Sequence, residues 1–152
     1  ALGAAWLVDE LISVANANEE MKQLGTINPK IQALSQQLKA AKFQASATDI
    51  ISLIEQRNNL LRYSVSVSNK RLAVFSEMHY PNGWQAYLND KPISHYKVNY
   101  LLRGVVVPPG NHELVFRFEP EVVRKGTWVM ASGWLFFFIM LGLIIRKPKT
   151  VA

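Results

Sequence analysis

The 152-residue sequence predicts a mainly β protein with some α structure. The expected architecture is an antiparallel, immunoglobulin-like β-sandwich, preceded by two short helices and followed by one transmembrane helix. Three observations lead to this prediction. About seven short segments alternate apolar and polar residues and end at turn-forming residues. Of two earlier segments, one has helix-capping residues at its ends and the other places its apolar residues at helical spacing. A long apolar run lies near the C-terminus.

The lead-in to the sandwich combines strand and helix signals. Residues 4–14 suit a strand with an irregularity at its centre, with a helix as the alternative. Asn18 can then cap a short helix that Gly25 closes. An Asn-Pro pair repeats the start signal, and the apolar residues that follow are spaced by three and four. We therefore predict a second, amphipathic helix at 30–42.

Beyond Asp49 the apolar pattern changes from a helical period to a period of two. The clearest strand is 61–68, where Leu61, Tyr63 and Val65 alternate with polar residues. The other predicted strands are 51–55, 72–78, 84–88, 93–96, 100–107 and 114–118. Turn signals separate them at 58–59, 69–70, 81–83, 89–90 and 108–111. Short strands at this regular spacing are typical of a sandwich.

The apolar run WVMASGWLFFFIMLGLII at 128–145 contains no ionisable side chain. Its length of about 18 residues is near the lower limit for a helix that crosses a ~30 Å hydrocarbon core. Trp128 and Trp134 lie toward one end, where indole rings suit the headgroup level. A buried core helix is the alternative, but core helices are usually shorter and carry polar residues. We expect this segment to span a lipid bilayer.

These patterns divide the chain into five parts. We predict a lead-in of one strand and two helices at 1–48 and a β-sandwich at 49–122. A linker at 123–127 precedes the membrane helix at 128–145, and a basic tail at 146–152 ends the chain. No signal peptide opens the sequence, so we expect it to be the C-terminal part of a longer protein.

The composition excludes several classes of function. Five of the 17 basic residues flank the apolar run, which leaves 12 against 11 acidic residues. The net charge of +6 therefore belongs to the membrane boundary, and we expect no nucleic-acid partner. Without cysteine there is no disulfide and no thiolate chemistry. No motif for a cofactor, a nucleotide or a catalytic serine is present, and we expect no cofactor.

Candidate catalytic and metal-binding side chains are few. His79, His95 and His112 lack the spacing of metal ligands, although two could meet across strands, and we predict no metal site. Glu77 stands in a largely apolar strand, where we expect it to bond nearby backbone or pair with Arg103. No second carboxylate accompanies it, so a glycoside hydrolase is the least expected class. We predict no catalytic residue in this chain.

Aromatic residues gather in the central strands and can serve either sugar contact or the core. Alternation places some of them on a shared face, where rings could stack on sugars. A core position is the commoner use of an aromatic on such a strand, for Trp84 above all. The aromatics concerned are Tyr80, Trp84, Tyr87, Tyr96 and Tyr100.

The segments AVFSEMHYPNGWQAYLNDKPI and VNYLLRGVVVPPGNHELVFRFEP resemble the C-terminal region of the YfhO-like family of bacterial multi-spanning membrane proteins. The openings ALGAAWLV and VANANEEMKQL are similar to that family's lead-in. Two departures stand out: Asn89-Asp90-Lys91 replaces a frequent Asp-Gly turn, and 30–42 reads as a helix where the family has a more strand-like stretch. The matching residues are Phe75, Ser76, Glu77, Tyr80, Pro81, Gly83, Trp84, Ala86, Asn99, Tyr100, Arg103, Gly104, Val107, Pro108, Gly110, His112, Phe116, Phe118 and Pro120.

The resemblance implies an indirect role for this chain. The family is similar to C-type glycosyltransferases, which use a polyprenyl-phosphate sugar donor at the outer membrane face. Some members of the YfhO-like family are linked to sugar decoration of envelope polymers such as teichoic acids. Their catalytic acid lies in the first extracytoplasmic loop, which this chain lacks. We therefore expect a non-catalytic C-terminal domain and last membrane span. The candidate sugar or acceptor contacts are Glu77, Tyr80, Trp84, Tyr100 and Arg103.

The same resemblance suggests partners and an orientation. The expected partners are the bilayer, the upstream membrane domain of the same polypeptide, and a polyprenyl-linked sugar or envelope glycopolymer. Arg146, Lys147 and Lys149 outnumber Arg124 and Lys125, which places the C-terminus in the cytoplasm and the sandwich outside the bacterial cell membrane. The alternative is a single-pass, membrane-anchored module that binds carbohydrate or protein. A structural assembly subunit, with a large exposed apolar patch, is a third possibility.

Overall fold

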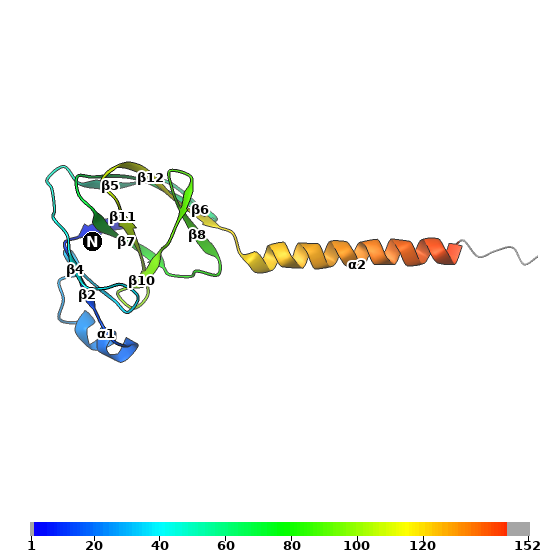
Figure 1. Ribbon diagram of the computed structural model, residues 1–152, viewed down its shortest axis with the longest axis horizontal. Coiled ribbons are helices and arrows are strands. Elements are labelled where there is room, and N and C mark those ends of the chain that lie inside the picture. Colours follow the sequence, from blue (N-terminus) through cyan, green and yellow to red (C-terminus); the bar gives the residue numbers. More distant parts are fainter. Residues whose placement is uncertain (1, 146–152) are drawn as a thin grey trace, which may run out of the picture. The chain divides into compact units, whose positions relative to one another are not determined.

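The computed structural model describes residues 2–145, which separate after Glu119 into a β-rich unit and a helical unit (Figure 1). The β-rich unit contains two main sheets whose strand pairs are all antiparallel. The predicted fold class, a mainly β protein with a sandwich and a C-terminal apolar helix, is confirmed. The part of it that fails is the second of the two short helices.

The two main sheets have mixed strand orders. The first contains, from edge to edge, β1 (Ala5–Val8), β7 (Arg71–Met78), β11 (Leu102–Val107) and β10 (Tyr96–Val98). The second contains β5 (Ile50–Arg57), β6 (Leu60–Val67), β12 (Gly110–Phe118), β8 (Trp84–Leu88) and β9 (Lys91–Ile93). Because β1 pairs with β7, the sandwich includes a strand from the predicted lead-in at 1–48.

The principal core lies between these sheets. Alternation on β6 turns one row of side chains inward, as the sequence predicts, and its opposite row toward solvent. Facing rows on β7 and β11 complete the layer from the other sheet. Its buried members are Leu61, Tyr63, Val65, Val67, Ala73, Phe75, Ala86, Val105, Val107, Leu114 and Phe116.

A small third sheet covers the outer face of the first sheet. It consists of β3 (Gln32–Ser35), β2 (Glu10–Ser13) and β4 (Ala41–Lys42), with β2 and β3 parallel and joined through α1 (Ala17–Leu24). A second core joins it to the sandwich: Val8, Leu11, Ala33, Leu72, Val74 and Val98. The irregularity predicted near Asp9-Glu10 is the break between β1 and β2.

The predicted helix at 30–42 is wrong, since this segment contains β3 and β4. Tertiary hydrogen bonds override the helical spacing: the Leu34 amide donates to Asn99 Oδ1 over 2.8 Å, and the Leu34 carbonyl accepts from the Asn99 amide over 2.9 Å. Helix α1 is where the sequence predicts a helix, but its N-cap is Asn16 rather than Asn18. The Asn16 side chain accepts from the Glu19 amide over 3.0 Å.

The turns between later strands are confirmed in part. Asn89 and Asp90 have φ of 50° and 62° and close the β8–β9 hairpin, as predicted. The predicted strands 93–96 and 100–107 are too simple, because a further turn at Asn99 and Tyr100, with φ of 47° and 70°, separates β10 from β11. The predicted turn at 108–111 is shorter, since β12 begins at Gly110.

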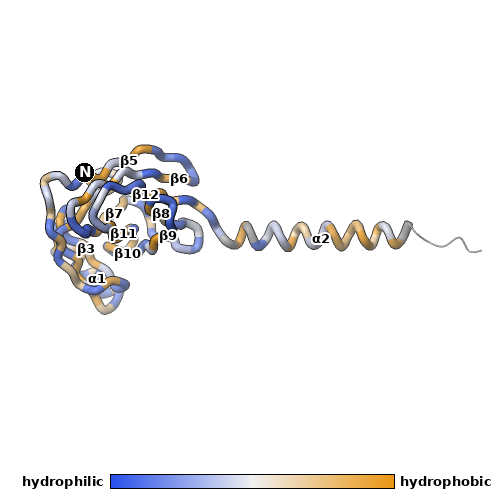
Figure 2. The backbone as a smooth tube through the Cα atoms, turned by 45° about the horizontal axis from the view of Figure 1, so that its top comes forward, coloured by the Kyte–Doolittle hydropathy of each residue, from blue (hydrophilic) through white to orange (hydrophobic). Residues whose placement is uncertain are grey.

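The helical unit is one helix, α2 (Glu121–Ile145). Residues Lys125–Leu143 are long and apolar enough to cross a membrane, and none of them is buried within the structure. Figure 2 shows apolar residues dominating the helix beyond its first turns. The predicted linker at 123–127 is helical and forms part of α2. The predicted tail at 146–152 lies outside the described residues.

Candidate functional site

One end of the inter-sheet core carries polar side chains. Arg103 on β11 is only 1% exposed, and Tyr63 on β6 is fully buried. Glu77 on β7 is half-buried at the edge of the same region. Burying charged and hydroxyl groups in a core costs free energy unless they have partners, so their contacts decide how the fold tolerates them.

Arg103 is held by rings and by one hydrogen bond. Its guanidinium carbon lies 4.4 Å from the ring centre of Phe116 and 4.9 Å from that of Trp84. Nη2 donates to the Met78 carbonyl over 3.0 Å, whereas Nε and Nη1 have no hydrogen-bond acceptor among residues 2–145. Burial lowers the pKa of Arg103 to about 10, although the charges of Glu77 and Tyr63 act to raise it.

Tyr63 and Glu77 complete this polar end. The Tyr63 hydroxyl is buried and has no hydrogen-bond partner within the described chain. Burial raises the pKa of Tyr63 to about 12; the charge of Glu77 adds to the rise and Arg103 opposes it. Glu77 forms no salt bridge with a described residue, so the expected pairing with Arg103 takes the form of a longer-range attraction.

A β-bulge presents Glu77 at this end. Phe75 pairs with Arg103, but the next pair joins Met78 to Leu102. Two residues of β7, Ser76 and Glu77, are therefore extra between adjacent positions of β11. Bulges of this kind bend a strand and redirect its side chains, and they are common beside functional sites.

Two histidines lie side by side close to Arg103. The sequence allowed such a meeting across strands but did not show which two histidines would meet. The ring centres of His79 and His95 lie 4.9 Å apart, and His95 Nε2 is 2.9 Å from the Trp84 carbonyl. Burial lowers the pKa of both imidazoles, and the charge of Arg103 lowers both further, while hydrogen bonds to backbone oppose the change. In the described part of the chain, no three potential ligands gather as a metal site.

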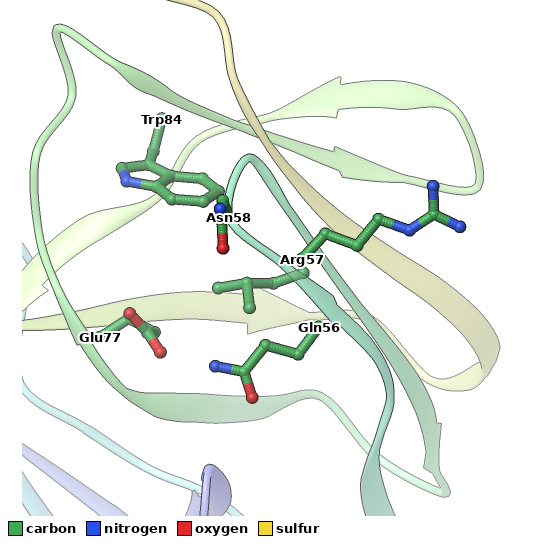
Figure 3. Close-up of a pocket in the computed structure, with 6 residues that line it drawn as sticks. Gln56, Arg57, Asn58, Glu77 and Trp84 are labelled. Atoms are coloured by element: carbon green, nitrogen blue, oxygen red, sulfur yellow. The ribbon is translucent and has the colours of Figure 1, made fainter.

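A polar pocket of about 400 Å³ opens beside this cluster (Figure 3). Glu77 and Trp84 contribute from the β7 and β8 side, opposite the end of the β5–β6 hairpin. The lining residues are Gln56, Arg57, Asn58, Leu61, Glu77 and Trp84. A pocket of this size accepts a small ligand, and its converging polar groups make it the candidate binding site.

The predicted contact residues divide into two groups. Glu77 and Trp84 line the pocket, while Tyr80, Tyr100 and Arg103 do not. Arg103 lies behind the pocket, against the ring of Trp84. Trp84 also packs on the core, so its two expected uses coexist.

The two tyrosines outside the pocket occupy other sites. Tyr80 is 49% exposed and lies over Gly83 beside Phe118. Tyr100 lies in the β10–β11 turn, where its amide donates to buried Glu20 over 2.8 Å.

Sequence reasoning missed Gln56 and Asn58. Gln56 is near the end of β5 and Asn58 is in the turn that follows, where polar residues are expected simply because a turn is exposed. No signal in the sequence marked them, because only the folded sheet order brings the β5–β6 turn beside Glu77 and Trp84.

Comparison with known proteins identifies one family. The family model described as bacterial membrane protein YfhO matches residues 12–130, which covers most of the β-rich unit and the start of α2. A search of curated proteins and a search of solved structures found no match.

Proposed function

The chain belongs to the YfhO family of bacterial membrane proteins, and on this premise we propose that it is the C-terminal part of a membrane glycosyltransferase acting on cell-envelope polymers. In this proposal residues 49–122 form most of an extracytoplasmic, non-catalytic domain, and 128–145 lie within the last membrane span. The observation that carries it is the family match, which runs through the β-rich unit and into a helix able to cross a bilayer.

A non-catalytic role is supported by the charges at the pocket. Among residues 2–145, Glu77 is the single carboxylate that lines it. Glycoside hydrolysis generally uses two carboxyl groups that flank the bond. Arg103 is buried against the ring of Trp84 and does not line the pocket, and Arg57, which does, is bound to Glu55. These groups suit binding better than glycoside hydrolysis.

A second candidate function is a membrane-anchored module that binds carbohydrate, and the polar pocket favours it. The two functions differ in what precedes this chain in the gene. A series of membrane spans with an acidic residue in the first outer loop supports the transferase. A signal peptide alone supports the anchored module.

The test of catalysis uses the full-length gene product in membrane vesicles, with a labelled polyprenyl-phosphate sugar as donor. We expect transfer in the wild type and, at saturating acceptor, comparable transfer in Glu77→Gln. Loss of all transfer in a Glu77→Gln protein that still folds and inserts would show that the domain is catalytic. Absence of transfer in the wild type would favour the anchored module.

A separate experiment tests on which side of the membrane the β-rich unit lies. Because the chain contains no cysteine, an introduced cysteine is its single thiol. Cysteine introduced at exposed Ser68 provides one labelling site in the sandwich. We expect a membrane-impermeant maleimide to label Ser68→Cys in intact cells, compared with the parent protein as background. Labelling only after the cells are opened would place the domain in the cytoplasm.

A further inference from the structure

Four polar side chains of the pocket make no hydrogen bond or salt bridge to any other residue of the described chain. They are the amides of Gln56 and Asn58, the carboxylate of Glu77 and the indole N–H of Trp84. Arg57, by contrast, is bound to Glu55 over 2.6 Å. The pocket thus combines donors and acceptors whose capacity is left for a ligand or for water.

The walls of this pocket are held by the fold. Trp84 lies between the Arg103 guanidinium, 4.9 Å from its ring centre, and the Phe118 ring, 5.4 Å away at a steep angle. Glu77 is fixed on the bulge of β7, and Gln56 lies in the ladder of β5 opposite Leu61. Strand pairing fixes the backbone beneath Gln56, Glu77 and Trp84, so a ligand needs to order only side chains there.

The charge of the pocket selects among ligands. Glu77 is a carboxylate, and Arg103 does not line the space. Arg57 is in the lining, but its guanidinium points away from the other lining side chains (Figure 3) and is bound to Glu55 over 2.6 Å. A phosphate or carboxylate ligand would therefore meet the negative charge of Glu77, while the cation in the lining, Arg57, is bound to Glu55. A ligand that is neutral and rich in hydroxyl groups meets suitable partners instead.

Sugars present the chemistry that these side chains match. Adjacent hydroxyls of a pyranose can donate to a carboxylate and exchange hydrogen bonds with a carboxamide, which both donates and accepts. An indole offers an apolar ring beside a single N–H donor, which suits the mixed apolar and polar faces of a sugar ring. The volume of about 400 Å³ is in the range of small-ligand pockets.

We propose that the pocket formed by Gln56, Asn58, Glu77 and Trp84 binds a neutral pyranose through adjacent hydroxyl groups. This inference rests on the proposed function, since it names the class of acceptor or product that the domain holds. Glu77 and Gln56 bind the hydroxyls, and Trp84 provides the apolar wall. Binding needs neither the sugar donor nor the upstream membrane domain.

The experiment uses the 152-residue chain in lipid nanodiscs, with saturation-transfer NMR and calorimetry. The probes are the methyl pyranosides of glucose, galactose, mannose and N-acetylglucosamine, with glucose 6-phosphate as the anionic comparison. We expect at least one neutral probe to bind with a millimolar Kd and more tightly than the phosphate. Gln56→Ala and Glu77→Gln should each weaken it roughly fivefold to tenfold, as expected for a lost hydrogen bond.

A matched control separates the pocket from general effects on the protein. Gln44 is also an exposed glutamine but does not line the pocket, so Gln44→Ala should leave the Kd unchanged. Calorimetric unfolding of each variant checks that the fold is retained. Gln56→Ala is the primary variant because the Gln56 side chain is exposed and makes no hydrogen bond or salt bridge within the described chain that its loss would remove.

Three outcomes would overturn the proposal. They are binding of no neutral probe, an unchanged Kd in folded Gln56→Ala and Glu77→Gln, and tighter binding of glucose 6-phosphate. Each can occur while the full-length protein still transfers sugar, in which case the proposed function stands and the pocket assignment fails. If the pocket binds sugar but the full-length protein has no transferase activity, the pocket assignment stands and the proposed function fails.

Discussion

Phe116 on β12 joins the apolar core to the polar end that carries the pocket. It is fully buried, and its ring centre lies 5.0 Å from that of Phe75 and 4.4 Å from the Arg103 guanidinium carbon. Truncating a buried Phe to Ala costs about 3–5 kcal/mol. Phe116→Ala also removes a desolvated cation–π contact, so we expect the upper part of that range, about 5 kcal/mol.

The expected change in melting temperature follows from the size of the β-rich unit, residues 1–119. Unfolding entropy of about 2.1 cal/mol/K per residue corresponds to roughly 0.25 kcal/mol/K for this unit. A loss of about 5 kcal/mol therefore lowers Tm by about 20 °C. Differential scanning calorimetry of the chain in detergent micelles measures this shift.

Phe118, two residues further along the same strand, provides the control. It is 40% exposed and contacts Trp84 by a ring edge, so Phe118→Ala should cost about 1 kcal/mol, or roughly 4 °C. Tm shifts of similar size in the two variants would refute the reasoning. They would mean that the buried ring of Phe116 contributes no more than the exposed one.

Three further predictions concern buried polar groups. Tyr63→Phe removes a buried hydroxyl with no described partner, so calorimetry should show a gain of about 1 kcal/mol, whereas a loss would reveal a partner. Glu20→Ala leaves the Tyr100 amide without its acceptor, so we expect the free energy of unfolding to fall by about 2 kcal/mol and hydrogen exchange at the Tyr100 amide to become faster. Unchanged exchange at Tyr100 would contradict this. The pKa values of His79 and His95 in the folded protein lie below the usual 6.5, so below that pH the unfolded chain binds more protons than the folded one. The free energy of unfolding should therefore fall as the pH drops below about 6.5. A His79→Gln, His95→Gln double variant should lose much of that pH dependence in thermal melts between pH 7.5 and 5, and an unaltered dependence would count against it.

Local signals in the sequence predicted those parts of the fold that depend on near neighbours. The alternation on β6 places Tyr63 and Val65 in the core, and Asn89-Asp90 closes a hairpin with its own backbone preference. The apolar run of α2 is recognisable from composition alone. None of these requires knowledge of a distant residue.

Features that depend on distant residues were not predictable in this way. Residues 32–35 form a strand because β2 pairs with them and Asn99 bonds Leu34, some 65 residues along the chain. The turn at Asn99 and Tyr100 has positive φ without glycine, and buried Glu20 stabilises it from α1. Strand order likewise decides the site, since it brings the β5–β6 turn beside Glu77 and Trp84.

The bond between Glu20 and the Tyr100 amide also has a consequence for biosynthesis, because its ends are 80 residues apart in sequence. At about 5–20 residues per second, a ribosome needs roughly 4–16 s to make that length of chain. Over this interval α1 and the first strands exist without the hairpin that buries Glu20. The contact that ties α1 to the β10–β11 turn therefore forms late in the synthesis of the β-rich unit, after most of its strands have been made.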